Sequence, residues 1–196
     1  MSILVRDVQF HTIEDAQLKL LIGYAEQDIH DFTRQAAALT LLKAIIRRKL
    51  VSTDLSEVVT KCEEISIQSY EASIRRQCRE VVAAYLMDYP VGDKLRDHLE
   101  FYITQLDYEV ECGRLSAIDM LKTMINVFPP GTVVVYSGFF FIPLAMRLVN
   151  DESAECKKQA QAAIIVLLGK LDSNQRNLLF NMCMTWLQAE KVNSNY

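Results

Sequence analysis

The sequence predicts an all-α protein, a right-handed α-solenoid (α-α superhelix) of about four helix pairs plus one extra C-terminal helix. Apolar residues recur at helical spacing along almost the whole chain, and the alternation typical of strands is nearly absent. Only 6 Gly and 4 Pro occur in 196 residues, which is too few turn formers for a sandwich or barrel. A hydrophobic fraction of 51% with 23% charged residues excludes a disordered chain.

The third observation is a repeated stripe, in which a basic residue is followed by small or apolar residues three, seven and eleven positions later. These offsets place the side chains on one face of a helix, and stacked copies can share a continuous core. The starting residues are separated by 41, 39 and 43 positions, the period of two-helix repeats of the HEAT and armadillo class. The four copies are Arg34, Ala37, Leu41 and Ile45; Arg75, Cys78, Val82 and Leu86; Arg114, Ala117, Leu121 and Ile125; and Lys157, Ala160, Ile164 and Leu168.

Each helix that carries the stripe is called a B helix, and we expect it to follow a shorter A helix across a polar turn. The pairs are expected to form a single array over residues 1–196, with no second domain. The A helices are predicted near Glu14–Ile29, Asp54–Gln68, Asp93–Tyr108 and Val134–Asn150. The B helices are predicted near Asp31–Lys49, Glu71–Tyr89, Arg114–Phe128 and Glu152–Leu171. The repeats then cover about 14–50, 54–90, 93–130 and 133–171, with a half repeat at 173–190. The helix of the half repeat, Ser173–Ala189, is expected to lack a partner helix and to expose hydrophobic surface.

Two stretches carry resemblances to known proteins. The run Phe139–Asp151 resembles the HEAT consensus, with Pro143 inside helix A and an Asn-Asp turn before helix B. A second resemblance rests on a longer set of motifs. These are Arg34-Gln35-Ala36, Leu42-Lys43-Ala44-Ile45, Ile74-Arg75-Arg76-Gln77-Cys78-Arg79, Met87-Asp88-Tyr89-Pro90-Val91-Gly92-Asp93-Lys94-Leu95, His98-Leu99-Glu100-Phe101, Gln105-Leu106-Asp107-Tyr108-Glu109 and Gly113-Arg114.

These motifs are similar to the large HEAT-repeat scaffold of the small-subunit processome, the "down-regulated in metastasis" family of the U3 small nucleolar ribonucleoprotein. The likeness runs from about Glu14 to Leu187, and members of that family are far longer than 196 residues. It implies non-catalytic nucleolar work in pre-rRNA processing and small-subunit assembly. The implied partners are other processome proteins, with pre-rRNA or snoRNA as further candidates. It implies no membrane and no small-molecule substrate.

Nothing in the sequence assembles an enzyme, a cofactor site or a metal site. There is no P-loop, no G-x-S-x-G and no G-x-G-x-x-G, and His11, His30 and His98 are too scattered for a zinc site. His98 is expected to be a partly exposed helix residue. The 5 cysteines form no C-x-x-C pair, which predicts small core residues in a reducing compartment. Neither a secretory leader nor a membrane span is predicted.

Basic clusters are the only surface signal for binding, because the net charge of −4 and pI of 5.4 argue against a general nucleic-acid binder. Cations at the end of a helix complement its dipole, whereas arginines at the start of one need another explanation. The structural interpretation pairs those arginines with Glu71 and Glu80, and the functional one has them contact phosphate or an acidic partner. The weak candidates are Arg75, Arg76, Arg79, Arg47, Arg48, Lys49, Lys157 and Lys158.

Three hypotheses therefore stay open for a non-enzymatic chain. The first is the processome scaffold. The second is a direct RNA-binding helical-repeat module that uses the arginines of the second B helix. The third is a HEAT adaptor of the transport-receptor or phosphatase-scaffold type.

Overall fold

The chain forms helices and no strand in the residues that the computed structural model describes, 2–7 and 12–193, which confirms the all-α class. His11 lies outside these residues. The chain divides into two compact units, Met1–Met120 and Leu121–Tyr196, called here the first and the second unit. Each is described by itself.

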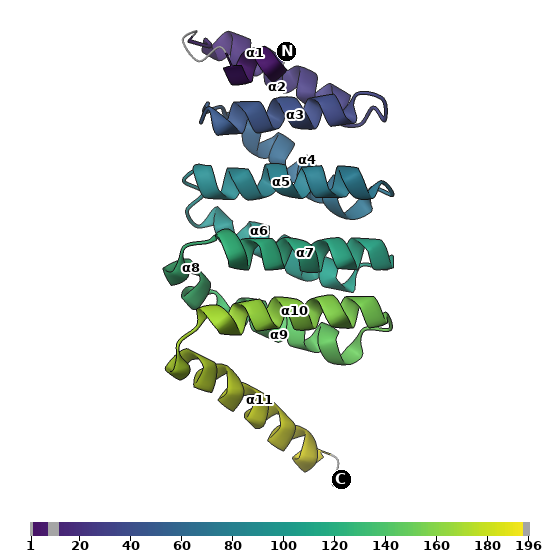
Figure 1. Cartoon of the computed structure of the whole chain (residues 1–196), viewed down its shortest axis with the longest axis vertical. Coiled ribbons are helices and arrows are strands. Elements are labelled where there is room, and N and C mark those ends of the chain that lie inside the picture. The colour runs from purple at the N-terminus through teal and green to yellow at the C-terminus, as the bar shows by residue number, and fades with distance from the viewer. Residues whose placement is uncertain (1, 8–11, 194–196) are drawn as a thin grey trace. The chain divides into compact units, whose positions relative to one another are not determined.

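The first unit contains three pairs of helices with one short helix before them. Its helices are α1 (Ser2–Asp7), α2 (Asp15–Asp28), α3 (Gln35–Arg47), α4 (Thr53–Gln68), α5 (Ala72–Asp88) and α6 (Lys94–Thr104) with the 3₁₀ turn Gln105–Asp107, followed by α7 (Glu111–Val127), which runs on into the second unit. The pairs α2–α3 and α4–α5 pack face to face, α2 also contacts α4, and α3 also contacts α5. In Figure 1, α3 and α5 lie in successive rows with α4 behind them. The A helices and the B helices therefore form two layers within this unit.

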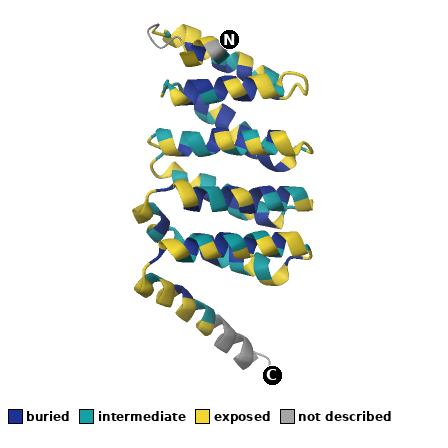
Figure 2. Ribbon diagram, in the orientation of Figure 1, coloured by how far each residue is buried: buried dark blue, intermediate teal, exposed yellow. Residues whose placement is uncertain are grey.

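The core of the first unit lies between these layers, where the inward faces of the helices are buried (Figure 2). Cys78 and Ala117 are fully buried, as the repeated stripe predicts. In the first copy the prediction is wrong by one residue, because Ala37 is exposed and Ala38 is buried. Leu41 and Ile45, the later positions of this copy, are buried as predicted, so the stripe does face the core and only its first position differs.

The second unit is built around the pair α9 (Ser137–Asn150) and α10 (Ala154–Lys170). A short helix, α8 (Pro130–Val135), packs on both, and α11 (Ser173–Asn193) follows. Pro143 lies inside α9, as the HEAT-like run predicts, and Ala160 is fully buried in α10. The Ser153 side chain caps α10 by accepting a hydrogen bond from the Cys156 backbone N–H at 3.2 Å.

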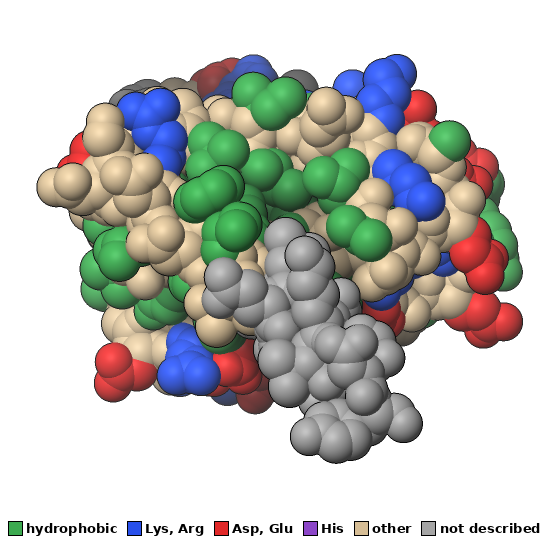
Figure 3. Space-filling model, turned by 90° about the horizontal axis from the view of Figure 1, so that it is seen from below, with side chains coloured by type: hydrophobic (Ala, Val, Ile, Leu, Met, Phe, Trp, Pro, Cys, Tyr) green, Lys and Arg blue, Asp and Glu red, His purple; other side chains and the backbone are tan. Residues whose placement is uncertain are grey.

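The expected hydrophobic surface near the last helix is present in the described side chains. Ile165 of α10 and Leu178 and Phe180 of α11 are each at least 60% exposed. The view in Figure 3 shows hydrophobic side chains near the centre of this end of the protein and charged side chains toward its margin.

All nine predicted helices are present, with ends that differ by up to four residues. The sequence prediction omitted α1 and α8, which have 6 residues each. Two turns are too short for a hydrophobic period to be recognised. In α8, Pro130 occupies the first turn, a position where proline starts a helix.

Candidate interaction surface

The basic residue that opens the repeated stripe has an internal role in two of the copies. Arg75 Nη1 donates to the backbone oxygens of Ser69 and Tyr70, at 2.7 and 2.9 Å. Arg114 Nη1 donates to the oxygens six and five residues before it in the same way, both at 3.0 Å. These carbonyls lie in the turn between an A and a B helix, where helix ends leave acceptors unpaired. The recurring arginine therefore holds the turn together.

The other two arginines of α5 differ in exposure. Arg79 has a side chain only 14% exposed and donates to Ser116 Oγ and, at 2.6 Å, to Asp119 of α7. Arg76 is 69% exposed and lies 3.8 Å from Glu80. The expected pairing of these arginines with Glu71 and Glu80 is therefore correct for Arg76, but wrong for Arg75 and Arg79.

The three consecutive cations at the end of α3 do not form one patch. Arg47 is exposed, and Arg48 Nη1 donates to the backbone oxygen of Val5 at 3.3 Å. Lys49 adopts a φ of 54° and its Nζ lies 3.2 Å from Asp88 Oδ1. Lys49 also occupies the left-handed position of a Schellman motif, in which its N–H and that of the next residue bond back to α3 at 2.8 and 3.4 Å. Two of these three cations, Arg48 and Lys49, thus contact other helices of the first unit.

The two lysines of α10 belong to the second unit. Lys157 is half-buried, and Lys158 is exposed with its Nζ 3.7 Å from Glu155. The structure therefore does not bring them together with the arginines within one unit. This pair remains a predicted site.

Ion pairs between successive helices use much of the charge in the first unit. In the B layer, Lys43 pairs with Glu80 of the next helix, as Lys49 does with Asp88. In the A layer, Lys61 of α4 pairs with Glu26 of α2. Sequence reasoning missed these pairs, although opposite charges separated by about one repeat were a readable signal. They neutralise cations that would otherwise attract phosphate.

A buried polar cluster links α4 and α6. Glu63 is 3% exposed, and its Oε1 lies 2.7 Å from Nδ1 of His98, whose side chain is 11% exposed. His98 is a partly exposed residue of α6, as expected, and it is also the interhelical partner of a buried acid, which the sequence prediction did not include. Burial raises the pKa of Glu63, and the hydrogen bond from His98 opposes that rise.

The cluster continues through hydroxyl groups toward α7. Ser66 Oγ and Tyr102 Oη lie 3.1 Å apart, and Ser116 Oγ donates to the Ser66 backbone oxygen. Burial raises the pKa of Tyr102 well above its usual range, so its hydroxyl stays protonated. No buried side-chain nitrogen or oxygen in the described part of the chain lacks a hydrogen-bond partner. The cluster is a satisfied packing element, without a polar group left over for a substrate.

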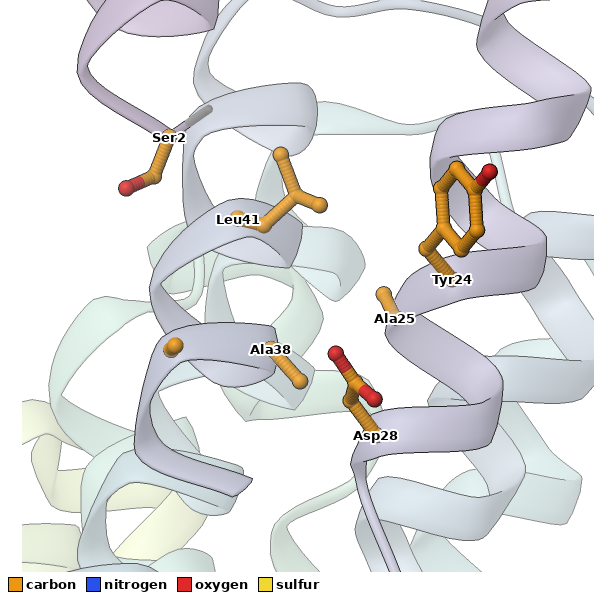
Figure 4. A pocket seen from close by; sticks show the side chains of 7 residues that line it. Ser2, Tyr24, Ala25, Asp28, Ala38 and Leu41 are labelled. Carbon is orange, nitrogen blue, oxygen red and sulfur yellow. The ribbon is translucent and has the colours of Figure 1, made fainter. Parts of the chain in front are cut away.

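The described surface of the first unit includes hollows between its helices. One, of about 280 Å³, lies between α2 and α3 beside α1, and Figure 4 shows the side chains around it. Another, of about 330 Å³, lies between the starts of α2 and α4, where Lys19 and Asp54 approach to 3.8 Å. In the residues that are described, no three His, Cys, Asp or Glu side chains come together in a way that would hold a metal ion. The five cysteines are free thiols, and Cys62, Cys78 and Cys156 are buried.

These features define a class of protein, an all-helical chain of packed helix pairs in which several ion pairs join one helix to another. The described helices include none that is long and apolar enough to cross a membrane. No protein-family model matches the chain.

Two curated proteins are similar to it over most of its length. The chain is 27% identical over 184 residues, 93% of its length, to the U3 small nucleolar RNA-associated protein 20 of Schizosaccharomyces pombe. It is 25% identical over 178 residues, 90% of its length, to the protein of the same name from Saccharomyces cerevisiae. In both comparisons the chain spans about 7% of the length of the relative.

Proposed function

We propose that this chain is a HEAT-like α-solenoid scaffold segment that works in nucleolar pre-rRNA processing and assembly of the small ribosomal subunit. The observation that carries the proposal is the similarity, over 90–93% of the chain, to two proteins named for association with U3 small nucleolar RNA. The partners proposed are processome proteins, and the setting is the nucleus and nucleolus. The chain contributes binding and no catalysis.

The packing of the first unit supports a scaffold mechanism. Helix pairs stack in two layers, and ion pairs such as Lys43–Glu80 and Lys61–Glu26 fix successive helices to one another. A repeat that adds a small rotation at each step creates an extended surface, which holds partners at fixed separations. The turn-holding arginines, Arg75 and Arg114, keep that step similar from one pair to the next.

The contacts of the basic residues favour binding through protein over direct RNA binding. Arg75 and Arg79 direct their guanidinium groups to protein acceptors, which leaves Arg76 and Arg47 as the exposed arginines at these two clusters. Two separated cations give little counterion release, because affinity for a nucleic acid grows with the number of phosphates that are neutralised.

A crosslinking experiment in nuclear extract tests the proposal. The tagged full chain is crosslinked, and both proteins and RNA are identified by mass spectrometry and sequencing. We expect enrichment of U3 ribonucleoprotein components over a helical control protein of equal size. Absence of that enrichment, with the helical circular dichroism spectrum intact, would refute the proposed role.

The same experiment separates protein binding from RNA binding. A double variant, Arg47→Glu with Arg76→Glu, removes the exposed arginine of each of these two clusters, and Lys94→Glu is the control at another exposed cation. We expect protein crosslinks to persist in both variants. Loss of RNA crosslinks in the double variant alone, together with steep salt dependence, would instead establish the RNA-binding module.

A further inference from the structure

The three turns from an A helix to a B helix in the first unit share an arrangement, in which an exposed apolar side chain is next to a carboxylate in the sequence. The pairs are Asp31 and Phe32, Tyr70 and Glu71, and Glu109 and Val110. Phe32, Tyr70 and Val110 are 76%, 91% and 43% exposed. Single exposed apolar residues are ordinary, whereas a repeated one indicates an interaction site. We call these three turns the turn edge.

The turns follow one another along one side of the first unit. α3 packs on α5 and α2 on α4, and the α2–α3 and α4–α5 turns lie at the same end of their helix pairs, on the right in Figure 1. Arg79 of α5 donates to Ser116 and Asp119 of α7, which places the third turn next. Packed helix axes lie about 8–10 Å apart. An extended segment covers that interval in about three residues, at roughly 3.1–3.4 Å each.

Hydrogen bonds hold the backbone of each turn in place. The Thr33 backbone N–H donates to Asp31 Oδ1 at 2.8 Å. Arg75 donates to the Tyr70 oxygen at 2.9 Å, and Arg114 donates to the Glu109 oxygen at 3.0 Å. The exposed side chains therefore extend from ordered backbone, which lowers the entropy that a partner loses on binding them.

The carboxylates of the turn edge favour a cationic partner. Glu71 and Glu109 are exposed, and neither forms an ion pair within the described part of the chain. Asp31 is less available, because its Oδ2 lies 3.9 Å from Arg34. Residues 1–120 contain 20 Asp and Glu against 14 Lys and Arg, so the surrounding field has the same sign.

The cations of the same turns are already bound within the protein. Arg34 lies 3.4 Å from Asp28, and Arg75 and Arg114 donate to backbone oxygens. An A helix ends and a B helix begins at each turn, so the positive and negative ends of their dipoles offset each other. The turn edge is therefore a poor site for phosphate, and its side-chain carboxylates determine the preferred charge.

We propose that the turn edge docks an extended, arginine- or lysine-rich segment of a partner protein, with a basic residue at about every third position. The aliphatic stem of each basic side chain covers Phe32, Tyr70 or Val110, and its charged head reaches the neighbouring carboxylate. The two aromatic rings add cation–π contacts. One such contact is weak, so the affinity comes from repetition along the row. This inference does not depend on the role in ribosome assembly.

Peptides in the polyproline II conformation test the spacing, because each turn of three residues advances about 9 Å. The first fluorescein-labelled peptide repeats arginine-proline-proline about five times. The second has the same composition with the arginines in adjacent pairs, and the third carries glutamate in place of arginine. With the full chain, we expect saturable fluorescence anisotropy for the first peptide and roughly tenfold weaker affinity for the others. Equal affinity of the first two would refute the proposed spacing and with it the proposal.

Substitutions of exposed residues locate the binding. Tyr70→Ser and Phe32→Ser should each weaken binding of the first peptide by about two- to fivefold, and together by roughly tenfold. Val51→Ser is the matched control, because Val51 is 76% exposed in the α3–α4 turn, at the other end of the helix pair. We expect no change in this control. If the double variant binds as tightly as Val51→Ser, the turn edge is not the binding site.

The charge of the site is tested by neutral amides. Glu71→Gln with Glu109→Gln should weaken binding of the first peptide by roughly fivefold and reduce its dependence on salt. The control is Glu57→Gln with Asp97→Asn, which removes exposed carboxylates near the starts of α4 and α6. Equal losses in the two double variants would show attraction to the overall charge and contradict the proposal.

A labelled single-stranded oligouridylate tests the other class of macromolecule. We expect Tyr70→Ser to leave any binding of this RNA unchanged, because the carboxylates beside the ring repel phosphate. Weaker RNA binding in Tyr70→Ser, with peptide binding unaffected, would make the turn edge an RNA site and overturn the proposal. These binding assays contain no processome component, so their outcome is separate from that of the crosslinking experiment.

Discussion

Removal of His98 should destabilise the first unit through the acid that it leaves behind. Glu63 is 3% exposed, and its carboxylate is paired with His98 at 2.7 Å. His98→Leu retains an apolar side chain of similar size against Tyr85, whose ring lies 6.2 Å from the imidazole. It leaves Glu63 buried without its partner. Breaking a buried pair from one side costs about 3–5 kcal/mol, because the remaining charge must be desolvated alone.

The loss of stability in His98→Leu should depend on pH, in a direction set by the burial of Glu63. Burial raises the pKa of Glu63 in the folded state, so the folded chain holds this proton more tightly than the unfolded chain. A raised pKa means that the stability contribution is complete below the unfolded-state pKa and is lost as the pH rises through the folded-state value. In His98→Leu the hydrogen bond that lowers the pKa of Glu63 is absent, so the stability lost as the pH rises should be larger than in the wild type. We expect the variant to be closer to wild type near pH 4 than near pH 8.

Urea unfolding, followed by circular dichroism at both pH values, measures this effect. The control is the double variant Glu63→Leu with His98→Leu, which removes the buried charge as well as its partner. Replacement of a complete buried pair by apolar groups is often neutral or stabilising. We therefore expect the double variant to recover most of the stability lost in His98→Leu. If the double variant is as unstable as the single one at pH 8, or if the single loss does not change with pH, the reasoning is wrong.

Substitutions at four further positions test the packing. Lys49→Gly should be more stable than Lys49→Ala by about 1 kcal/mol in thermal melts, because a φ of 54° is unfavourable for any side chain and both variants lose the pair with Asp88. Arg114→Ala should lose about 1–2 kcal/mol by leaving turn carbonyls without their donor, with Arg114→Lys recovering only part of it. Gly113→Ala should lose about 1–3 kcal/mol in urea unfolding, since its Cβ would lie 2.3 Å from the Tyr108 ring and 3.1 Å from a backbone oxygen. Gly169→Ala, whose Cβ meets no atom within 4 Å, should instead gain roughly 0.5–1 kcal/mol. Equal effects at the two glycines would contradict the close approach at Gly113.

The regular helices were predictable because their stripes repeat over several turns. α4 and α10, for example, begin and end within two residues of their predicted bounds. In α3 the same pattern identified the helix and two of its buried residues, Leu41 and Ile45, but its first position, Ala37, is exposed. The pattern therefore predicts the buried face along most of the helix and is least accurate at the helix start.

The candidate binding residues were harder to predict because a basic side chain has many possible acceptors. The sequence shows Glu71 and Glu80 beside the arginines of α5, and only one of the expected pairs forms. Arg75 instead reaches backbone oxygens, and Arg79 reaches a residue 40 positions away in α7. Backbone acceptors leave no trace in side-chain identity, and contacts between repeats require the stacking register to be known.

The distribution of charge has a consequence for how such a chain recognises its partners. Cations and carboxylates that join successive helices, such as Lys43 and Glu80, satisfy each other and present little net field to a ligand. Specificity must then come from what the stacking leaves uncovered. In the first unit that surface includes the hollow between α2 and α3 and the hollow between the starts of α2 and α4. Reversal of the charge at Arg76 should therefore leave protein crosslinks largely unchanged, which the crosslinking experiment with Arg76→Glu measures.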